Sequence, residues 1–390
     1  MLQKLINLGI YLTILSLPLY LFRFRVFWTP FNVLEVLIYT SFCLWLFQIV
    51  FFGVKPIIIE KQWVCPAFFI FFGVTLSTLF SQNINISAGI WKSWFIAPML
   101  FALVLIHSIK TKAQLKRIIV SLVLSGAVVA LIALFYWFGN DLTYDGRLRA
   151  FFLSPNHLAM YLSPILLLSL SLYPLIKQKN FKILLFLIQS IFFFVVYLTY
   201  SHGAWLGLIG ALVFLIILRL KPKRLYVVRL SAALMIFTLV IIIFISLFSP
   251  SIFFGKSRLV IWRSALEIIK DHPWLGIGPG MFQRYYLEYQ KYFLPYPEWA
   301  APQPHNIFLA FWLQAGLIGL IGFIWLLVVW FKEVLGNLSG VYHSFLASSA
   351  VAMIYVLVHG LTDTTYWKND LSVVFWLIIA LGYIMSHRFD

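Results

Sequence analysis

The sequence predicts an all-α fold: a polytopic integral membrane protein with about twelve transmembrane helices and one long polar loop. Two observations carry this prediction. The chain of 390 residues is 63% hydrophobic and has a mean hydropathy of +0.96, which is far above the value for a soluble domain. The apolar residues also fall into twelve separate runs, each close to the roughly 20 residues that a helix needs to cross a bilayer.

In chain order, the runs lie at 5–22, 31–52, 63–80, 94–109, 118–138, 157–176, 183–200, 204–218, 230–247, 306–331, 344–361 and 371–385. Backbone groups in lipid must find their hydrogen-bond partners within the segment, so we expect each run to be a helix. The alternating pattern of a transmembrane barrel is absent. The first run lacks a cleavage site and eleven runs follow it, so we expect it to remain as a helix.

The basic residues predict how the chain is oriented in the membrane. Twelve spans place both termini on one side, and most of the 29 lysines and arginines lie in short segments on that side. This asymmetry predicts cytoplasmic termini and an outward-facing long loop at 248–305. Such scattered cations favour membrane topology over nucleic-acid binding, so no nucleic-acid partner is expected despite the net charge of +17. The loop has further cations that topology does not explain, and an anionic ligand would explain them.

We expect one membrane domain over 1–390, with the loop inside it. Within the loop, residues 258–270 predict an amphipathic helix. A turn rich in proline and glycine follows at 273–280. Aromatic residues at helical spacing over 282–293 predict a second helix, whose aromatic face we expect in the membrane interface, with sugar stacking as the alternative. The glycines are not a nucleotide-binding loop, because no strand and helix surround them.

Little in the sequence indicates a metal or a disulfide. Cys43 and Cys65 lie in or beside apolar runs, and the outer loop has no cysteine. The chain has 12 acidic residues, and they do not gather into the oxygen-rich sets that hard metals require. We therefore expect neither a metal site nor another cofactor.

Four sequence features follow one another along the chain in the order seen in the bacterial O-antigen ligases and resemble theirs. The relatives of these ligases include O-antigen polymerases and protein O-oligosaccharyltransferases. The resemblance covers the chain from about residue 146 to the C-terminus. Its most specific part is His305-Asn306 followed by Gly316 and Gly319. The other parts are Gly146-Arg147 with Ser154-Pro155-Asn156-His157, Arg258-x3-Trp262 followed by the 273–280 turn, and Asp363.

The resemblance implies a metal-independent, inverting glycosyltransferase of the bacterial cytoplasmic (inner) membrane. The implied donor is a glycan on undecaprenyl pyrophosphate, the site faces the periplasm, and the leading acceptor is the lipid A–core oligosaccharide of lipopolysaccharide biosynthesis. A growing glycan is the acceptor in a polymerase, and a protein hydroxyl is a third alternative. A lipid-linked glycan transporter is the rival from another class. The spans are nearly free of charge, which argues against a polar path across the membrane.

The reaction implied by the resemblance needs a base for the acceptor hydroxyl and cations for the departing diphosphate. His305 suits the first role, because histidine exists neutral near neutral pH and this one begins a helix. Arg147 and Arg258 suit the second, because a guanidinium stays charged and binds two phosphate oxygens at once. Arg149 and Arg263 are secondary candidates, with anchoring to lipid headgroups as the alternative for all four arginines.

Three further positions are predicted to assist. Asp363 would orient a basic residue or the acceptor, or else cap a loop. Asn306 would contact substrate or cap its helix. His202 stands where relatives usually have arginine, so it would contact the substrate when protonated, or another residue would. For His157 we expect packing or helix capping.

Overall fold

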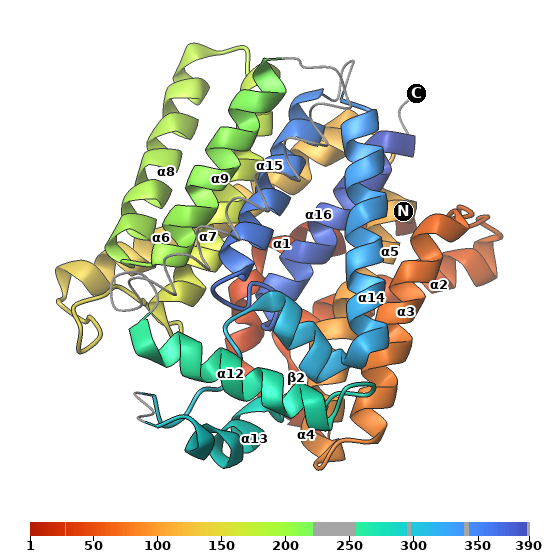
Figure 1. Cartoon of the computed structure of the whole chain (residues 1–390). Helices are drawn as coiled ribbons and strands as arrows, with labels where there is room; N and C mark the ends of the chain where they lie inside the picture. The colour runs from red at the N-terminus through yellow and green to blue at the C-terminus, as the bar shows by residue number, and fades with distance from the viewer. Residues whose placement is uncertain (28, 221–254, 295–297, 339–342, 388–390) are drawn as a thin grey trace.

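The computed structural model describes residues 1–27, 29–220, 255–294, 298–338 and 343–387. Within them the chain forms a helical bundle (Figure 1). Nine described segments are long and apolar enough to cross a bilayer, which confirms an all-α polytopic membrane fold. They are α2 (Val33–Phe52), α3 (Lys61–Leu79), α4 with η2 and α5 (Ile84–Ser108), α6 (Lys112–Phe138), α7 with η3 (Pro155–Leu175), α8 (Lys179–Leu198), α14 (Ile307–Gly336), α15 (His343–Gly360) and α16 (Asn369–His387).

Two of these segments change helix type along their length. The first runs from α4 (Ile84–Ile90) through a π-helical turn, η2 (Trp91–Ile96), into α5 (Ala97–Ser108). The second runs from α7 (Pro155–Ser169) into the 3₁₀ helix η3 (Leu170–Leu175). Both stay continuous, so each still corresponds to one predicted run.

Two shorter apolar helices account for two more predicted runs. They are α1 (Leu2–Leu15) and α9 (His202–Arg219). The run at 230–247 lies outside the described residues. The count of twelve therefore stays a prediction.

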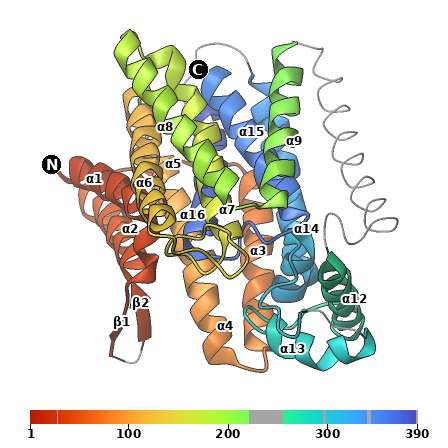
Figure 2. The ribbon, with the colours of Figure 1, turned by 90° about the vertical axis from the view of Figure 1, so that its left-hand side faces the viewer.

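A small β-hairpin interrupts the helices near the N-terminus. After the 3₁₀ helix η1 (Leu17–Leu21), β1 (Arg23–Val26) pairs antiparallel with β2 (Thr29–Asn32). The Asn32 side chain then accepts the backbone N–H of Glu35 and so caps α2. Apolar-run length predicts the helix but not this hairpin, which lies at the same end of the bundle as α4 and α13 (Figure 2).

The last two spans form the centre of the bundle. In α15 and α16, 89% and 94% of the most apolar window is buried inside the protein, against 28% for α2. Nearly all of their side chains are buried, as expected for helices that other helices surround. The loop between them, residues 361–368, is therefore also held in the interior.

The outer loop folds into helices that lie across one end of the bundle. They are α12 (Gly255–Asp271), α13 (Phe282–Tyr289) and the 3₁₀ turn η4 (Gln290–Tyr292), so both predicted loop helices are confirmed. The expected membrane position of the aromatic face is wrong for Phe282, Tyr285 and Tyr286, which are buried against α12. Because the loop has its own small core, these rings fill it instead of entering lipid.

The 273–280 turn is joined to α14 where that helix breaks. Gly316 has φ +71° and ψ 177°, so the helix changes direction there (Figure 1). The break releases the carbonyl of Leu313, which accepts the N–H of Ile277, and the N–H of Leu317, which donates to the carbonyl of Trp274 at 2.9 Å. A side chain at Gly316 would place its Cβ 2.6 Å from the Trp274 oxygen. Glycine is therefore required at this junction.

Candidate functional site

A buried carboxylate, that of Asp363, lies at the centre of the candidate site. It follows α15 in the 361–368 loop and its residue is 4% exposed. Its Oδ1 lies 3.0 Å from Nδ1 of His305, and its Oδ2 accepts a hydrogen bond from Asn156 Nδ2 at 2.6 Å. Arg258 Nη2 lies 4.0 Å from the same Oδ2. Asp363 thus joins residues from α7, α12 and the start of α14.

Arg147 reaches this carboxylate through one intermediate residue. Its Nη2 donates to Asn156 Oδ1 at 2.7 Å, and its Nε donates to the carbonyl of Thr199 at 2.8 Å. Burial lowers the pKa of Arg147, while Asp145 and Asp363 oppose that change. The guanidinium is therefore fixed by two polar neighbours at the end of α8 and the start of α7.

Arg258 is the second cation at Asp363. Burial lowers the pKa of its guanidinium, the carboxylates of Asp363 and Glu298 oppose this, and Arg147 reinforces it. Its Nη1 is buried and has no hydrogen-bond partner among the described residues. A buried, unpaired donor on a cation is costly, so this nitrogen is suited to an anionic ligand.

The backbone around His305 is unusual. Its φ is +48°, a conformation that is uncommon for residues other than glycine and is found at functional sites. The indole Nε1 of Trp262, one turn after Arg258 in α12, donates to the His305 carbonyl at 3.3 Å. Strain and an added hydrogen bond together fix where the imidazole points.

The contact with Asp363 decides the protonation pattern of the His305 ring. A carboxylate beside Nδ1 favours a proton on that nitrogen, which leaves Nε2 as the acceptor in the neutral ring. Within the described residues we find no hydrogen bond to Nε2, and the side chain is 16% exposed. The arrangement can accept a proton at Nε2 and stabilise the resulting imidazolium through Asp363.

The neighbouring Asn306 is occupied by its own helix. Its Oδ1 accepts the N–H groups of Phe308 and Leu309, and its Nδ2 donates to the carbonyl of Leu361 at 3.0 Å. These bonds correspond to the capping alternative. They also fix the start of α14 against the loop that carries Asp363.

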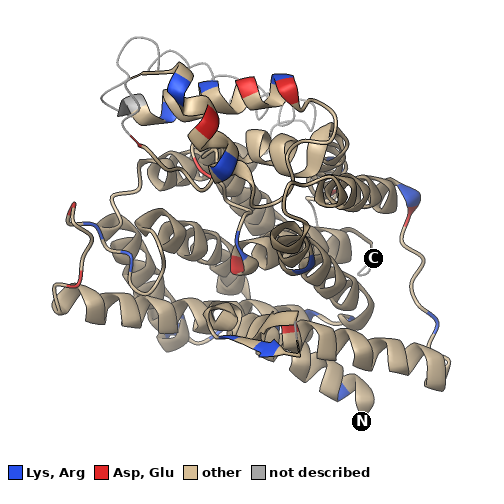
Figure 3. Ribbon diagram, turned by 90° about the horizontal axis from the view of Figure 1, so that it is seen from below, with Lys and Arg blue, Asp and Glu red and all other residues tan. Residues whose placement is uncertain are grey.

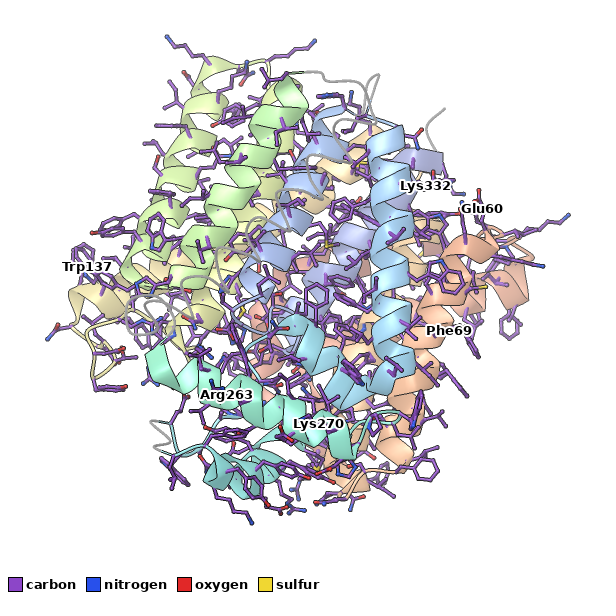
Figure 4. The ribbon with its side chains drawn as sticks, in the orientation of Figure 1. Glu60, Phe69, Trp137, Arg263, Lys270 and Lys332 are labelled. Atoms are coloured by element: carbon purple, nitrogen blue, oxygen red, sulfur yellow. The ribbon has the colours of Figure 1, made fainter. Side chains whose placement is uncertain are left out.

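The remaining predicted residues lie around the cluster. Arg149 and Arg263 are exposed and have no described contact with Asp363; Figure 4 shows Arg263 on α12, at the opposite end of the molecule from Lys332 and Glu60. His202 is exposed in the first turn of α9. A Cβ on the next residue, Gly203, would lie 2.5 Å from Thr362 Oγ1, so α9 begins directly beside the Asp363 loop.

Asn156 is the functional candidate that residue-type reasoning missed. It accepts from Arg147 and donates to Asp363, so it links the cation to the carboxylate. Its neighbour His157, expected to pack or cap, places Nε2 at 3.0 and 3.1 Å from the two oxygens of buried Asp370. This pair fixes the start of α7 to α16 behind Asn156. The sequence feature that could have indicated a role for Asn156 is its position directly after Pro155 at the start of a helix.

A buried cation of the site favours an anionic ligand. Asp145 lies 3.8 Å from Arg147 and Glu298 also acts on Arg258, so the support for an anion comes from the buried, unpaired Nη1 of Arg258 and not from an excess of positive charge. Charged residues gather on α12 and the loops, whereas the spans are nearly free of them (Figure 3). Within the described ranges, no three His, Cys, Asp or Glu side chains form a group that could hold a metal ion.

A comparison with protein families supports the same reading of this end of the molecule. Residues 184–324 match the family model described as O-antigen ligase. The match includes α12, the 273–280 turn and the segment from His305 to Gly319. It confirms the resemblance to the O-antigen ligase and polymerase superfamily, while Arg147, Asn156 and Asp363 lie outside the matched residues. No curated protein matches the chain.

Proposed function

Since residues 184–324 of this membrane protein match the O-antigen ligase family model, we propose that it is a glycosyltransferase that joins a glycan to the lipid A–core oligosaccharide. The donor is the glycan on undecaprenyl pyrophosphate, and the acceptor is a core hydroxyl. The reaction takes place at the periplasmic face of the bacterial inner membrane and uses no metal. All of residues 1–390 act as one membrane domain, with 248–305 as its periplasmic loop.

One observation carries this proposal: two guanidinium groups and an imidazole gather around a single buried carboxylate. Arg258 Nη1 is buried without a partner, and Arg147 is held nearby through Asn156. In the reaction, the diphosphate gains negative charge as it leaves. Fixed cations in a partly dry site stabilise such charge strongly.

The geometry suggests how the transfer proceeds. His305 Nε2 takes the proton of the acceptor hydroxyl, whose oxygen attacks the anomeric carbon from the side opposite the diphosphate. The bond between that carbon and the phosphate oxygen breaks, and the configuration inverts. Asp363 stabilises the imidazolium at Nδ1, and Arg147 and Arg258 stabilise the diphosphate.

The other predicted residues have lesser roles in this scheme. Arg149, Arg263 and His202 lie at the rim, where they can bind the glycan or lipid headgroups. Asn306 acts by fixing the start of α14 rather than by direct contact. The site's arginines, imidazole and carboxylate lie together at one end of the bundle and the spans carry little charge, which suits a one-sided reaction better than transport across the membrane.

The test uses purified protein in lipid nanodiscs with the lipid-linked glycan, chelator and lipid A–core. Product on the core supports the proposal. A ladder of longer donor-linked glycans would instead indicate a polymerase, and failure with both acceptors by folded protein would overturn the proposal. His305→Ala should lose transfer, whereas His272→Ala, a matched change in the same loop, should keep it.

A further inference from the structure

A groove lies between α6, η3 and α8 at the opposite end of the bundle from His305. Its volume is about 510 Å³, within the usual range for ligand sites. The position follows from α8, whose C-terminal end is beside Arg147, where Thr199 accepts the Arg147 Nε–H. The groove lies along the other half of the same helix, where Phe181 to Ile188 line it, about 17 to 27 Å from Thr199 at 1.5 Å per residue.

The walls of the groove are apolar and run along the helices. Val120 and Leu124 line it from α6, and Leu184 and Ile188 line it from α8. From its mouth at Lys116 to Leu124, the α6 wall is about 12 Å long. The chain of α7 becomes the narrower 3₁₀ helix η3 beneath the groove, and a 3₁₀ helix fills less width than an α-helix.

A polar contact holds two helices together next to the groove. Gln189, next to Ile188, donates from Nε2 to Ser169 Oγ at 2.7 Å and accepts from the Tyr173 hydroxyl at 2.8 Å. This contact holds α8 to α7. The groove between these helices therefore has fixed, apolar walls with lysines at one end, which suits a single hydrocarbon chain with a charged head.

Two lysines stand at the mouth. Lys116 and Lys177 line the groove, both are exposed, and no ion pair among the described residues involves either. The sequence has no Asp or Glu between Glu60 and Asp141, or between Asp145 and Glu267. The elements that build the groove therefore provide no counter-charge. The topology rule explains lysines in these loops but not their position at the mouth of one groove.

We propose that this groove binds one anionic phospholipid, with its phosphate between Lys116 and Lys177 and an acyl chain along Val120 and Leu124. Hydrocarbon tails in a bilayer are as apolar as the groove walls, so the tail alone gives little preference. The headgroup supplies the selectivity, because basic pockets between membrane helices bind anionic lipid heads. Each lysine near the phosphate is worth about a fivefold preference, so the pair gives about 30-fold.

Native mass spectrometry of the purified full chain tests this. The protein is mixed with equal amounts of phosphatidylglycerol and phosphatidylcholine, and the lipid that stays bound is counted. We expect one phosphatidylglycerol per chain, retained about 30-fold over phosphatidylcholine. Lys116→Gln with Lys177→Gln should lose this preference, whereas Lys55→Gln with Lys61→Gln, an equal charge change elsewhere, should keep it.

A second variant tests whether lipid binding needs the apolar groove as well as the two lysines. Leu124→Trp with Leu184→Trp fills the apolar part and leaves both lysines in place; these leucines are 49% and 51% exposed, so the larger side chains do not disturb the core. We expect this variant to lose the bound lipid while its thermal unfolding stays that of the unmodified chain. Retention of phosphatidylglycerol by either groove variant, or equal loss in the control, would overturn the proposal.

Discussion

Replacing Asp363 with asparagine, D363N, tests the centre of the proposed site. Two unit charges 3.0 Å apart, as His305 Nδ1 and Asp363 Oδ1 would be after proton transfer, interact by about 5.5 kcal/mol at an effective dielectric constant of 20. At 1.36 kcal/mol per tenfold, losing all of this would slow the reaction about 10⁴-fold. Asparagine still accepts a hydrogen bond, so we expect kcat to fall between about 10² and 10⁴-fold.

The Michaelis constant for the donor should behave differently in D363N. Asp363 Oδ2 lies 4.0 Å from Arg258 Nη2, so the carboxylate competes with the diphosphate for this cation. Its removal should leave the donor KM unchanged or lower it. If Asp363 served only the fold, its substitution would not lower kcat while leaving the donor KM unchanged or lower.

The assay measures initial rates of glycan transfer in nanodiscs across a series of donor concentrations, with thermal unfolding as the check on fold. Asp145→Asn is the control. Asp145 Oδ2 is 3.8 Å from Arg147 Nη1 but has no contact with His305, so we expect less than about a threefold change. A folded D363N protein with kcat within threefold of the unmodified chain would refute the His305–Asp363 couple.

Three other substitutions follow from the same geometry. Arg258→Gln should lower kcat about 10² to 10³-fold in the transfer assay, because it removes a fixed cation from the diphosphate; a change under fivefold would contradict this. Asn156→Ala should lower kcat/KM about tenfold, because Arg147 and Asp363 each lose a hydrogen bond, and unchanged kinetics would contradict the bridging role. Gly316→Ala should lower the melting temperature, since its backbone conformation (φ +71°, ψ 177°) costs about 1–3 kcal/mol in a residue other than glycine and its Cβ would clash. Gly89→Ala is the control and should leave the melting temperature unchanged, because no neighbouring atom lies within 4 Å of the added Cβ.

Most of the architecture could be predicted from the chain because burial in lipid imposes a simple rule. A segment long and apolar enough to span the bilayer must satisfy its own backbone, so run length alone identifies α2, α3 and the other long spans. The same rule does not predict the two strands β1 and β2. Their pairing depends on contacts across a turn, which run length does not report.

The candidate site, like the fold, could be predicted only in part from the sequence. Residue type and the family resemblance together selected His305, Arg147 and Arg258 as candidates, because few side chains accept a proton or hold a charge near neutral pH. Residue type could not show that Asn156 joins two of these groups, since an asparagine at a helix start usually caps it. The helical period separates Arg258 from Arg263, which lie five residues and about 140° apart on α12. Trp262, four residues from Arg258, shares its side of the helix.

The break at Gly316 also constrains the order in which the molecule is assembled. The backbone groups of Trp274 and Ile277 are bonded to Leu317 and Leu313, which come later in the chain and belong to a membrane span. Until that span is in the bilayer, these two groups have water as their partner. The polar segment therefore acquires its final shape through the inserted helix, and His305, which lies just before that helix and its cap Asn306, comes into position in the same step.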